Sequence, residues 1–178
     1  MTQANIFFII GVNGVGKSTL IPFLRSSLDG AKFVVHDFDE RGVPNNADKN
    51  WRASETFHWM KTGKTNTGKG ISTIICGFSK PQEIIDAAAK LDGKPKVCLL
   101  DANADVISQR ILSRYITPES IAELYRTTGK APKKFVMDNV YISSKFREES
   151  QKNLFHILDT SDLSPEQISA EIIKWVVS

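Results

Sequence analysis

Residues 4–20, ANIFFIIGVNGVGKSTL, decide the fold of this chain. An apolar run over residues 6–10 is typical of a buried strand, and three glycines, a lysine and two hydroxyl residues follow it. A helical pattern then begins near Gly16 and continues to about Leu28, where Asp29 starts a turn. The segment is therefore predicted to form a strand, a glycine-rich loop and a helix.

The glycine-rich loop matches the pattern glycine, any four residues, glycine, lysine, and serine or threonine, which is typical of a phosphate-binding loop. Its glycines let backbone N–H groups approach phosphate oxygens, and the helix directs its positive end at the same anion. Lys17 would reach the β- and γ-phosphates of ATP, and the Ser18 hydroxyl would bind Mg²⁺. A structural turn with an incidental lysine is the alternative, but the strand-loop-helix context favours phosphate binding. The residues expected to contact ATP here are Gly11, Asn13, Gly14, Val15, Gly16, Lys17, Ser18 and Thr19.

Length and composition indicate one globular domain over residues 1–178, because 41% of the residues are hydrophobic and 24% are charged. No run of 18 apolar residues and no leader-like N-terminus is present, so we expect a cytoplasmic protein without a membrane partner. Cys76 and Cys98 lie in apolar runs and are predicted to be buried thiols rather than a disulfide or a metal pair. The net charge of +3 is too small to indicate nucleic acid by itself.

Five apolar runs are predicted to be strands, and helical patterns separate most of them. This alternation predicts an α/β fold, a P-loop NTPase three-layer sandwich with a five-stranded parallel sheet, helices on both faces and a lid. Two segments fit the alternation poorly and are interpreted as insertions: residues 41–70 as an acceptor-binding insertion and residues 115–147 as the lid. Within the first, the GKT stretch at residues 63–65 is expected to be a solvated turn. The predicted strands are residues 6–10, 33–36, 71–76, 97–100 and 155–158.

Two carboxylates follow the second predicted strand. Asp37 and Asp39 are two residues apart, so on an extended chain their side chains point the same way, beyond the carboxyl end of the strand. Doubly wound sheets bind ligands at that edge. One carboxylate could hold Mg²⁺, and the other could take a proton from an attacking hydroxyl. The alternative is a pair of acids that cap a loop.

The loop together with Asp37-x-Asp39 resembles the small-molecule P-loop kinases, shikimate kinase in particular. That family continues with an aromatic residue, Arg, two residues and Glu, and residues 51–55 here read WRASE. Its third strand ends in a short glycine-rich motif, of which this chain keeps one glycine, Gly77.

The resemblance implies roles for five residues. Asp37, with Ser18, would lie near the metal, and Asp39 would face the acceptor hydroxyl. Arg52 would bind an anionic or polar group of the acceptor, Glu55 would orient Arg52, and Gly77 would face the acceptor. The reduced glycine motif puts shikimate itself in question as the acceptor.

A basic segment supplies further candidates. From residue 110 to residue 147 the chain has eight Lys and Arg against three Asp and Glu. Arg110 and Arg114 are four apart on one face of a predicted helix, and planar guanidinium groups suit the charge of a phosphoryl group in transfer. An exposed arginine pair is the alternative. Beyond the fifth strand, loops in the resembling family touch the nucleotide base, which makes Thr160 a candidate there. The alternative is that Thr160 only ends the strand.

The pattern as a whole favours a kinase that moves the terminal phosphate of MgATP to a hydroxyl of a small metabolite. A nucleotide or polynucleotide 5′-hydroxyl kinase is the alternative, since aromatic residues punctuate the basic segment and could stack on bases. An ATPase or switch module is a third reading. It usually needs a third strand that ends in a metal-binding Asp, and this strand ends in Cys76 and Gly77. The sequence indicates neither the acceptor nor the oligomeric state.

Overall fold

The computed structural model describes residues 4–44 and 47–178, and in these residues the chain forms five strands and seven helices. All strands are parallel, in the order β2-β3-β1-β4-β5. The predicted α/β fold is confirmed, and every predicted strand is present with its ends within one residue of the prediction. In chain order the elements are β1 (Ile6–Ile10), α1 (Lys17–Ser27), β2 (Phe33–Asp37), α2 (Lys49–Thr67), β3 (Ser72–Gly77), α3 (Pro81–Leu91), β4 (Lys96–Asp101), α4 (Ala104–Leu112), α5 (Pro118–Thr128), α6 (Pro132–Lys152), β5 (His156–Asp159) and α7 (Pro165–Val177).

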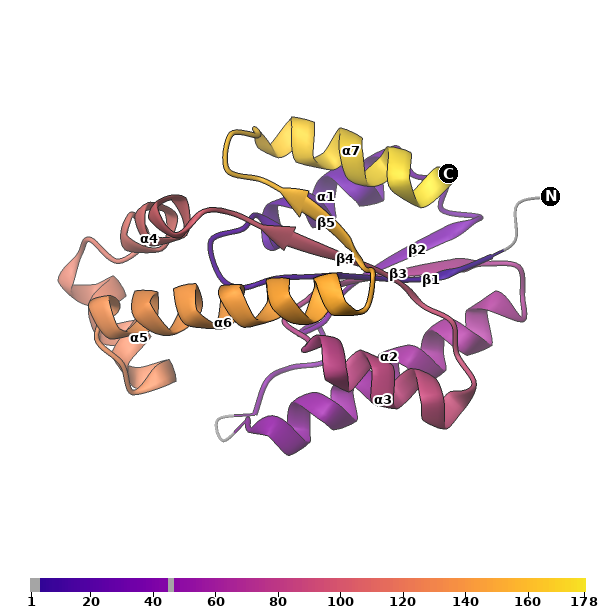
Figure 1. The fold of residues 1–178 in the computed structure, drawn as a ribbon, viewed down its shortest axis with the longest axis horizontal. Coiled ribbons are helices and arrows are strands. Elements are labelled where there is room, and N and C mark those ends of the chain that lie inside the picture. The colour runs from indigo at the N-terminus through magenta and orange to yellow at the C-terminus, as the bar shows by residue number, and fades with distance from the viewer. Residues whose placement is uncertain (1–3, 45–46) are drawn as a thin grey trace.

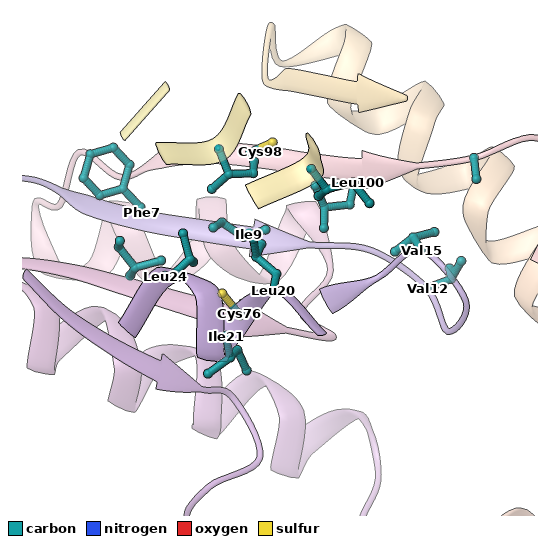
Figure 2. Close-up of a cluster of buried hydrophobic side chains, with 14 of the residues drawn as sticks. Phe7, Ile9, Val12, Val15, Leu20, Ile21, Leu24, Cys76, Cys98 and Leu100 are labelled. Atoms are coloured by element: carbon teal, nitrogen blue, oxygen red, sulfur yellow. The ribbon is translucent and has the colours of Figure 1, made fainter. Parts of the chain in front are cut away.

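Strand β1 lies at the centre of the sheet, and every one of its residues is buried. Because successive side chains of a strand point to opposite faces, Phe7 and Ile9 join the core under α1 and α7, whereas Phe8 and Ile10 join the core under α2 and α3. Figure 1 shows these two helical layers above and below the sheet. Figure 2 shows Phe7 and Ile9 with Leu24 of α1 in the first of them.

The sheet order places the phosphate loop where ligands bind in this class of fold. The chain leaves β1 toward β2 on one side, and from β3 it crosses β1 to reach β4 on the other side. The carboxyl end of β1 is therefore a topological switch point, and the loop of residues 11–16 begins there. Helices α4 and α5 lie together at this end of the molecule (Figure 1).

Two expectations about segments need correction. Residues 63–65 lie inside helix α2 rather than in a solvated turn. Gly63 is buried, and its backbone packs so closely on β1 that an added Cβ would lie 2.8 Å from Ile6 Cγ2. The basic segment, residues 115–147, is divided between two helices. Val136 and Phe146 of α6 are buried in the core, so this helix is part of the body of the domain. Residues 115–131, which include α5, pack Tyr115 against the core and bury Leu124, while most of their other side chains are exposed.

No helix in the described part of the chain is both long enough and apolar enough to cross a membrane. Cys76 and Cys98 are both free and buried, and burial raises the pKa of the Cys76 thiol to about 12. The prediction that they are buried thiols is confirmed.

Candidate active site

The phosphate loop has a backbone that only glycine adopts readily. Gly14 has φ 90° and Gly16 has φ 102°, both in the left-handed region where a side chain causes strain. Val15, between these glycines, and Val12, two residues before Gly14, are buried and anchor the loop in the core (Figure 2). The loop is therefore fixed by its apolar residues and shaped by its glycines.

Three carbonyl groups of this loop accept hydrogen bonds from side chains. Lys17 Nζ donates to Val12 O at 2.7 Å, Arg110 Nη1 donates to Gly14 O at 3.3 Å, and the single hydroxyl proton of Thr160 is shared between Val15 O at 3.3 Å and Asp101 O at 2.9 Å. A peptide unit is planar and trans, so a fixed carbonyl fixes the N–H that points the opposite way. The bonds from Arg110 and Thr160 therefore orient the N–H groups of the two residues that follow those carbonyls, Val15 and Gly16.

Lys17 begins helix α1 and lies near both predicted carboxylates. Burial and then the charge of Arg114 lower the pKa of Lys17 to about 8, while the charges of Asp39 and Asp37 act in the opposite direction. The ammonium group is therefore held at an electrostatic cost in the free protein. An additional anion, such as a triphosphate, would relieve that cost.

Asp37 and Asp39 lie together at the carboxyl end of β2. The backbone N–H of Asp39 donates to Asp37 Oδ1 at 3.0 Å, and Phe38 between them is buried. Burial of its carboxyl group and the charge of Asp37 raise the pKa of Asp39, and Lys17 lowers it. A carboxylate with a raised pKa next to the phosphate-binding lysine is suited to accept a proton.

Arg110 and Arg114 are placed differently, although both line one pocket. The guanidinium group of Arg110 is bound to backbone carbonyls, with Nη2 at 2.8 Å from Thr160 O in addition to its bond with Gly14. Arg114 is exposed, and within the described residues its side chain forms no hydrogen bond or ion pair, although its backbone N–H donates to Ile111 O at 3.1 Å. The pocket has a volume of about 260 Å³ and is lined by Gly14, Gly16, Thr19, Leu20, Arg110, Ser113, Arg114, Leu163, Pro165 and Ile168.

Thr160 is fully buried, and its hydroxyl faces the back of the phosphate loop. Oγ1 lies 2.9 Å from Asp101 O as well as 3.3 Å from Val15 O, and its backbone N–H donates to Asp101 O at 2.8 Å. These bonds tie β4 and the loop that follows β5 to the phosphate loop. The sequence left Thr160 either as a contact to the base or as the end of the strand; in the structure it directly follows β5, and its side chain contacts the phosphate loop.

The residues carried over for the acceptor have other partners than the resemblance implies. Both Oε atoms of Glu83 accept from Arg52 Nε, at 3.0 and 2.9 Å, and Glu55 accepts from Arg41 Nη1 at 3.2 and 3.0 Å. Glu55 therefore does not orient Arg52. Gly77 is buried, and a Cβ there would lie 2.1 Å from the Cβ of Phe38, which is a packing reason for glycine.

Helix α6 contributes two residues that were not predicted from the sequence, Asn139 and Ser143, together with Arg147, which the sequence offered only as a weaker candidate for binding phosphate. Asn139, Ser143 and Arg147 are spaced by four and face the sheet. Asn139 Oδ1 accepts from the backbone N–H of Asn13 at 3.0 Å, and Asp101 at the end of β4 accepts from Ser143 Oγ at 2.7 Å and from Arg147. The four-residue spacing was the available signal, but the basic composition of the segment suggested a lid instead.

Oxygen ligands for a metal lie at the same edge. Ser18 is exposed in the first turn of α1, and Asp37 ends β2. No group of three or more His, Cys, Asp and Glu side chains able to hold a metal occurs in residues 4–44 and 47–178. Mg²⁺ at a phosphate site needs only one or two protein oxygens, because substrate phosphates and water complete its shell. The two residues fit such a site.

Comparison with known proteins supports this fold. No family model and no curated protein matches the sequence. Shikimate kinase from Acinetobacter baumannii, solved with shikimate, is 13% identical over 98% of this chain and 93% of its own, with a TM-score of 0.62. Thymidylate kinase from Candida albicans is 12% identical over 98% and 92%, with a TM-score of 0.61. The tunicamycin resistance protein of Deinococcus radiodurans is 16% identical over 97% and 95%, with a TM-score of 0.57. At these identities the likeness shows the fold, which is that of P-loop kinases, and it confirms the predicted P-loop NTPase fold.

Proposed function

We propose that the protein is a kinase that transfers the terminal phosphate of MgATP to a hydroxyl group of a small acceptor. The observation that carries this proposal is the cluster of Lys17, Asp37 and Asp39 at the switch point of the sheet. It combines a phosphate-binding lysine with a carboxylate whose pKa is raised. A module that only bound or hydrolysed a nucleotide would not need a proton acceptor suited to an alcohol. The kinase names of the structural neighbours agree with this proposal.

In the proposed complex, the phosphates of ATP lie on the loop, and the N–H groups of Val15 and Gly16 and the ammonium group of Lys17 bind them. The base occupies the pocket beside Arg110 and Leu163. Mg²⁺ would be held by Ser18 and, directly or through water, by Asp37, where it would neutralise charge on the phosphates. Because Arg110 and Thr160 are bound to the loop, we assign them to positioning rather than to the transferred group.

The proposed transfer step is an in-line displacement. The acceptor oxygen forms a bond to the γ-phosphorus while the bond from that phosphorus to the β–γ bridging oxygen breaks, and ADP leaves. The carboxylate of Asp39 takes the hydroxyl proton. Arg114, whose side chain forms no hydrogen bond or ion pair with the described residues, would bind the oxygens of the transferred group. Residues 115–131 would close over the site as a lid.

The structure supplies a reason to favour a small acceptor over a polynucleotide. Phe146 is buried, and Tyr115 and Phe135 pack against each other with ring centroids 6.1 Å apart. Tyr125 and Tyr141 are exposed. The aromatic residues of the basic segment therefore do not form one stacking surface. We also place the protein in the cytoplasm, where MgATP is available.

A transfer assay tests the proposal. The protein is incubated with γ-labelled ATP, Mg²⁺ and a panel of alcohols, and label on an acceptor is measured separately from free phosphate. We expect acceptor-dependent labelling that is lost in Lys17→Ala and Asp39→Asn, with unchanged circular dichroism. Release of free phosphate alone, insensitive to every acceptor and to Asp39→Asn, would contradict kinase function.

A further inference from the structure

The charges on the acceptor side of the site identify the class of acceptor. By acceptor side we mean residues 37–41, 51–55 and 77–83, which surround Asp39 at the carboxyl ends of β2 and β3. These ranges contain five carboxylates and three cations. Arg25 of α1 and Lys17 add two further cations, so carboxylates and cations are equal in number. An acceptor that enters here therefore meets no excess of positive charge.

The arginines of the acceptor side are already paired with buried carboxylates. Arg52 Nη2 lies 2.9 Å from Glu83, and the two side chains are only 17% and 13% exposed. Arg41 lies 3.0 Å from Glu55, whose side chain is 8% exposed. If either arginine turned to an anionic group of a substrate, its carboxylate would lose its cation in a largely enclosed place, and Glu83 would keep only the backbone N–H of Lys80 as a donor, which is unfavourable.

The remaining cations are no better placed. Arg25 donates to Val35 O and to Glu40, which turns it back onto β2. Lys80 is exposed at the start of α3. Lys17 belongs to the phosphates of ATP in the proposed function. No described cation on this side is therefore both unpaired and enclosed, as recognition of a carboxylate or phosphate on the acceptor would require.

Apolar aromatic surface accompanies this charge pattern. Trp51 and Phe78 are half-buried, with Trp51 edge-on to Phe38 at 6.2 Å and Phe78 under the guanidinium group of Arg52 at 5.5 Å. Flat aromatic faces bind the apolar faces of uncharged rings well.

From these observations we infer that the acceptor is a hydroxylated ring compound without a negatively charged group, such as a sugar or a nucleoside that carries neither carboxylate nor phosphate. This inference rests on the proposed kinase function and narrows its acceptor. An anionic acceptor would face the carboxylate of Asp39 and would find no free arginine on the acceptor side, because Mg²⁺, Lys17 and Arg114 are assigned to the phosphates of ATP. The paired arginines then act as a filter that excludes such molecules.

Matched pairs of acceptors test the inference. Each pair keeps the same ring and differs in one acidic group: methyl shikimate and shikimate, glucuronate methyl ester and glucuronate, and uridine and uridine 3′-monophosphate, which keeps its 5′-hydroxyl. Transfer from γ-labelled ATP is measured as kcat/KM. Wherever the enzyme transfers phosphate to a pair, we expect kcat/KM to be at least about tenfold higher for the uncharged member. A negatively charged member used as well as its uncharged partner would overturn the inference and leave kinase function intact. ATP binding through Lys17 without transfer to any member would overturn both.

Two variants probe the filter directly. Glu55→Gln frees the half-exposed Arg41, and Glu83→Gln frees Arg52, so each should raise relative use of the charged member by about tenfold. Glu148→Gln is the matched control, because Glu148 is an exposed glutamate that pairs with Lys145 on α6. If Glu83→Gln fails to fold, Glu55→Gln alone tests whether freeing an arginine changes the preference between charged and uncharged acceptors. An unchanged preference in folded Glu55→Gln would contradict the filter.

Discussion

Replacing Lys17 with methionine should stabilise the free protein while it destroys phosphate binding. The pKa of Lys17 falls from its ordinary 10.5 to about 8, mainly through burial. One pKa unit corresponds to about 1.36 kcal/mol, so holding this charge at neutral pH costs the folded state about 3 kcal/mol. Methionine fills similar space without charge but loses the bond to Val12 O, worth about 1 kcal/mol. The free energy of unfolding should therefore rise by about 2 kcal/mol.

The measurement is urea denaturation at pH 7 without nucleotide, with Lys133→Met at the exposed start of α6 as the control. Between about pH 8 and pH 10.5 folded Lys17 has lost its proton while the unfolded chain keeps it. The unfolded state then binds more protons, so wild-type stability gains on that of Lys17→Met as the pH rises through this range. A variant no more stable than the wild type at pH 7, or a stability gap that does not narrow with pH, would refute the reasoning.

Three further predictions concern the chemistry. Asp39→Asn should abolish transfer and leave MgATP binding within a few-fold by calorimetry, whereas Asp37→Asn should weaken the metal-dependent part of that binding. Because the charge of Asp37 raises the pKa of Asp39, Asp37→Asn should also move the acidic limb of the kcat/KM profile to lower pH; an unmoved limb would contradict the coupling. Arg114→Ala should lower kcat by about 10²–10³, as for loss of one donor to transition-state charge, and raise the pKa of Lys17. Hydrogen exchange in residues 115–131 should slow when ATP and an acceptor are added together. Equal exchange rates with and without these ligands would contradict the proposal that these residues act as a lid.

The local parts of this site could be predicted from the sequence because their signals are local. The glycine-lysine pattern of residues 11–18 and the apolar run before it specify a strand, a loop and a helix whatever surrounds them. The position of Asp37 and Asp39 at the end of a strand could also be predicted, but their proximity comes from the turn of residues 38–41, in which the N–H of Asp39 donates to Asp37 Oδ1, and not from an extended chain. The continuous apolar run of residues 6–10 predicted the buried strand that is β1.

The partners of charged side chains could not be predicted in this way. The resemblance implied that Glu55 orients Arg52, but packing of α3 against α2 brings Glu83 to Arg52, and Glu55 pairs with Arg41 instead. Likewise, the basic composition of α6 suggested an exposed lid, although Asn139 and Ser143 of this helix face the sheet and bond to Asn13 and Asp101. Ion pairs between elements depend on the tertiary arrangement, and sequence spacing carries no information about it.

The hydrogen bonds around the phosphate loop explain why positioning residues lie so far from it in sequence. The peptide that joins Val12 to Asn13 is held on both sides, by Lys17 at its carbonyl and by Asn139 at its N–H. If the ammonium group of Lys17 turns toward a triphosphate, as the proposed function requires, Asn139 still holds this peptide in place. The carbonyls bound by Arg110 and Thr160 do not depend on Lys17 at all. The loop can therefore release its lysine to the substrate without losing the orientation of its N–H groups, and such a preorganised anion site avoids reorganisation during transfer.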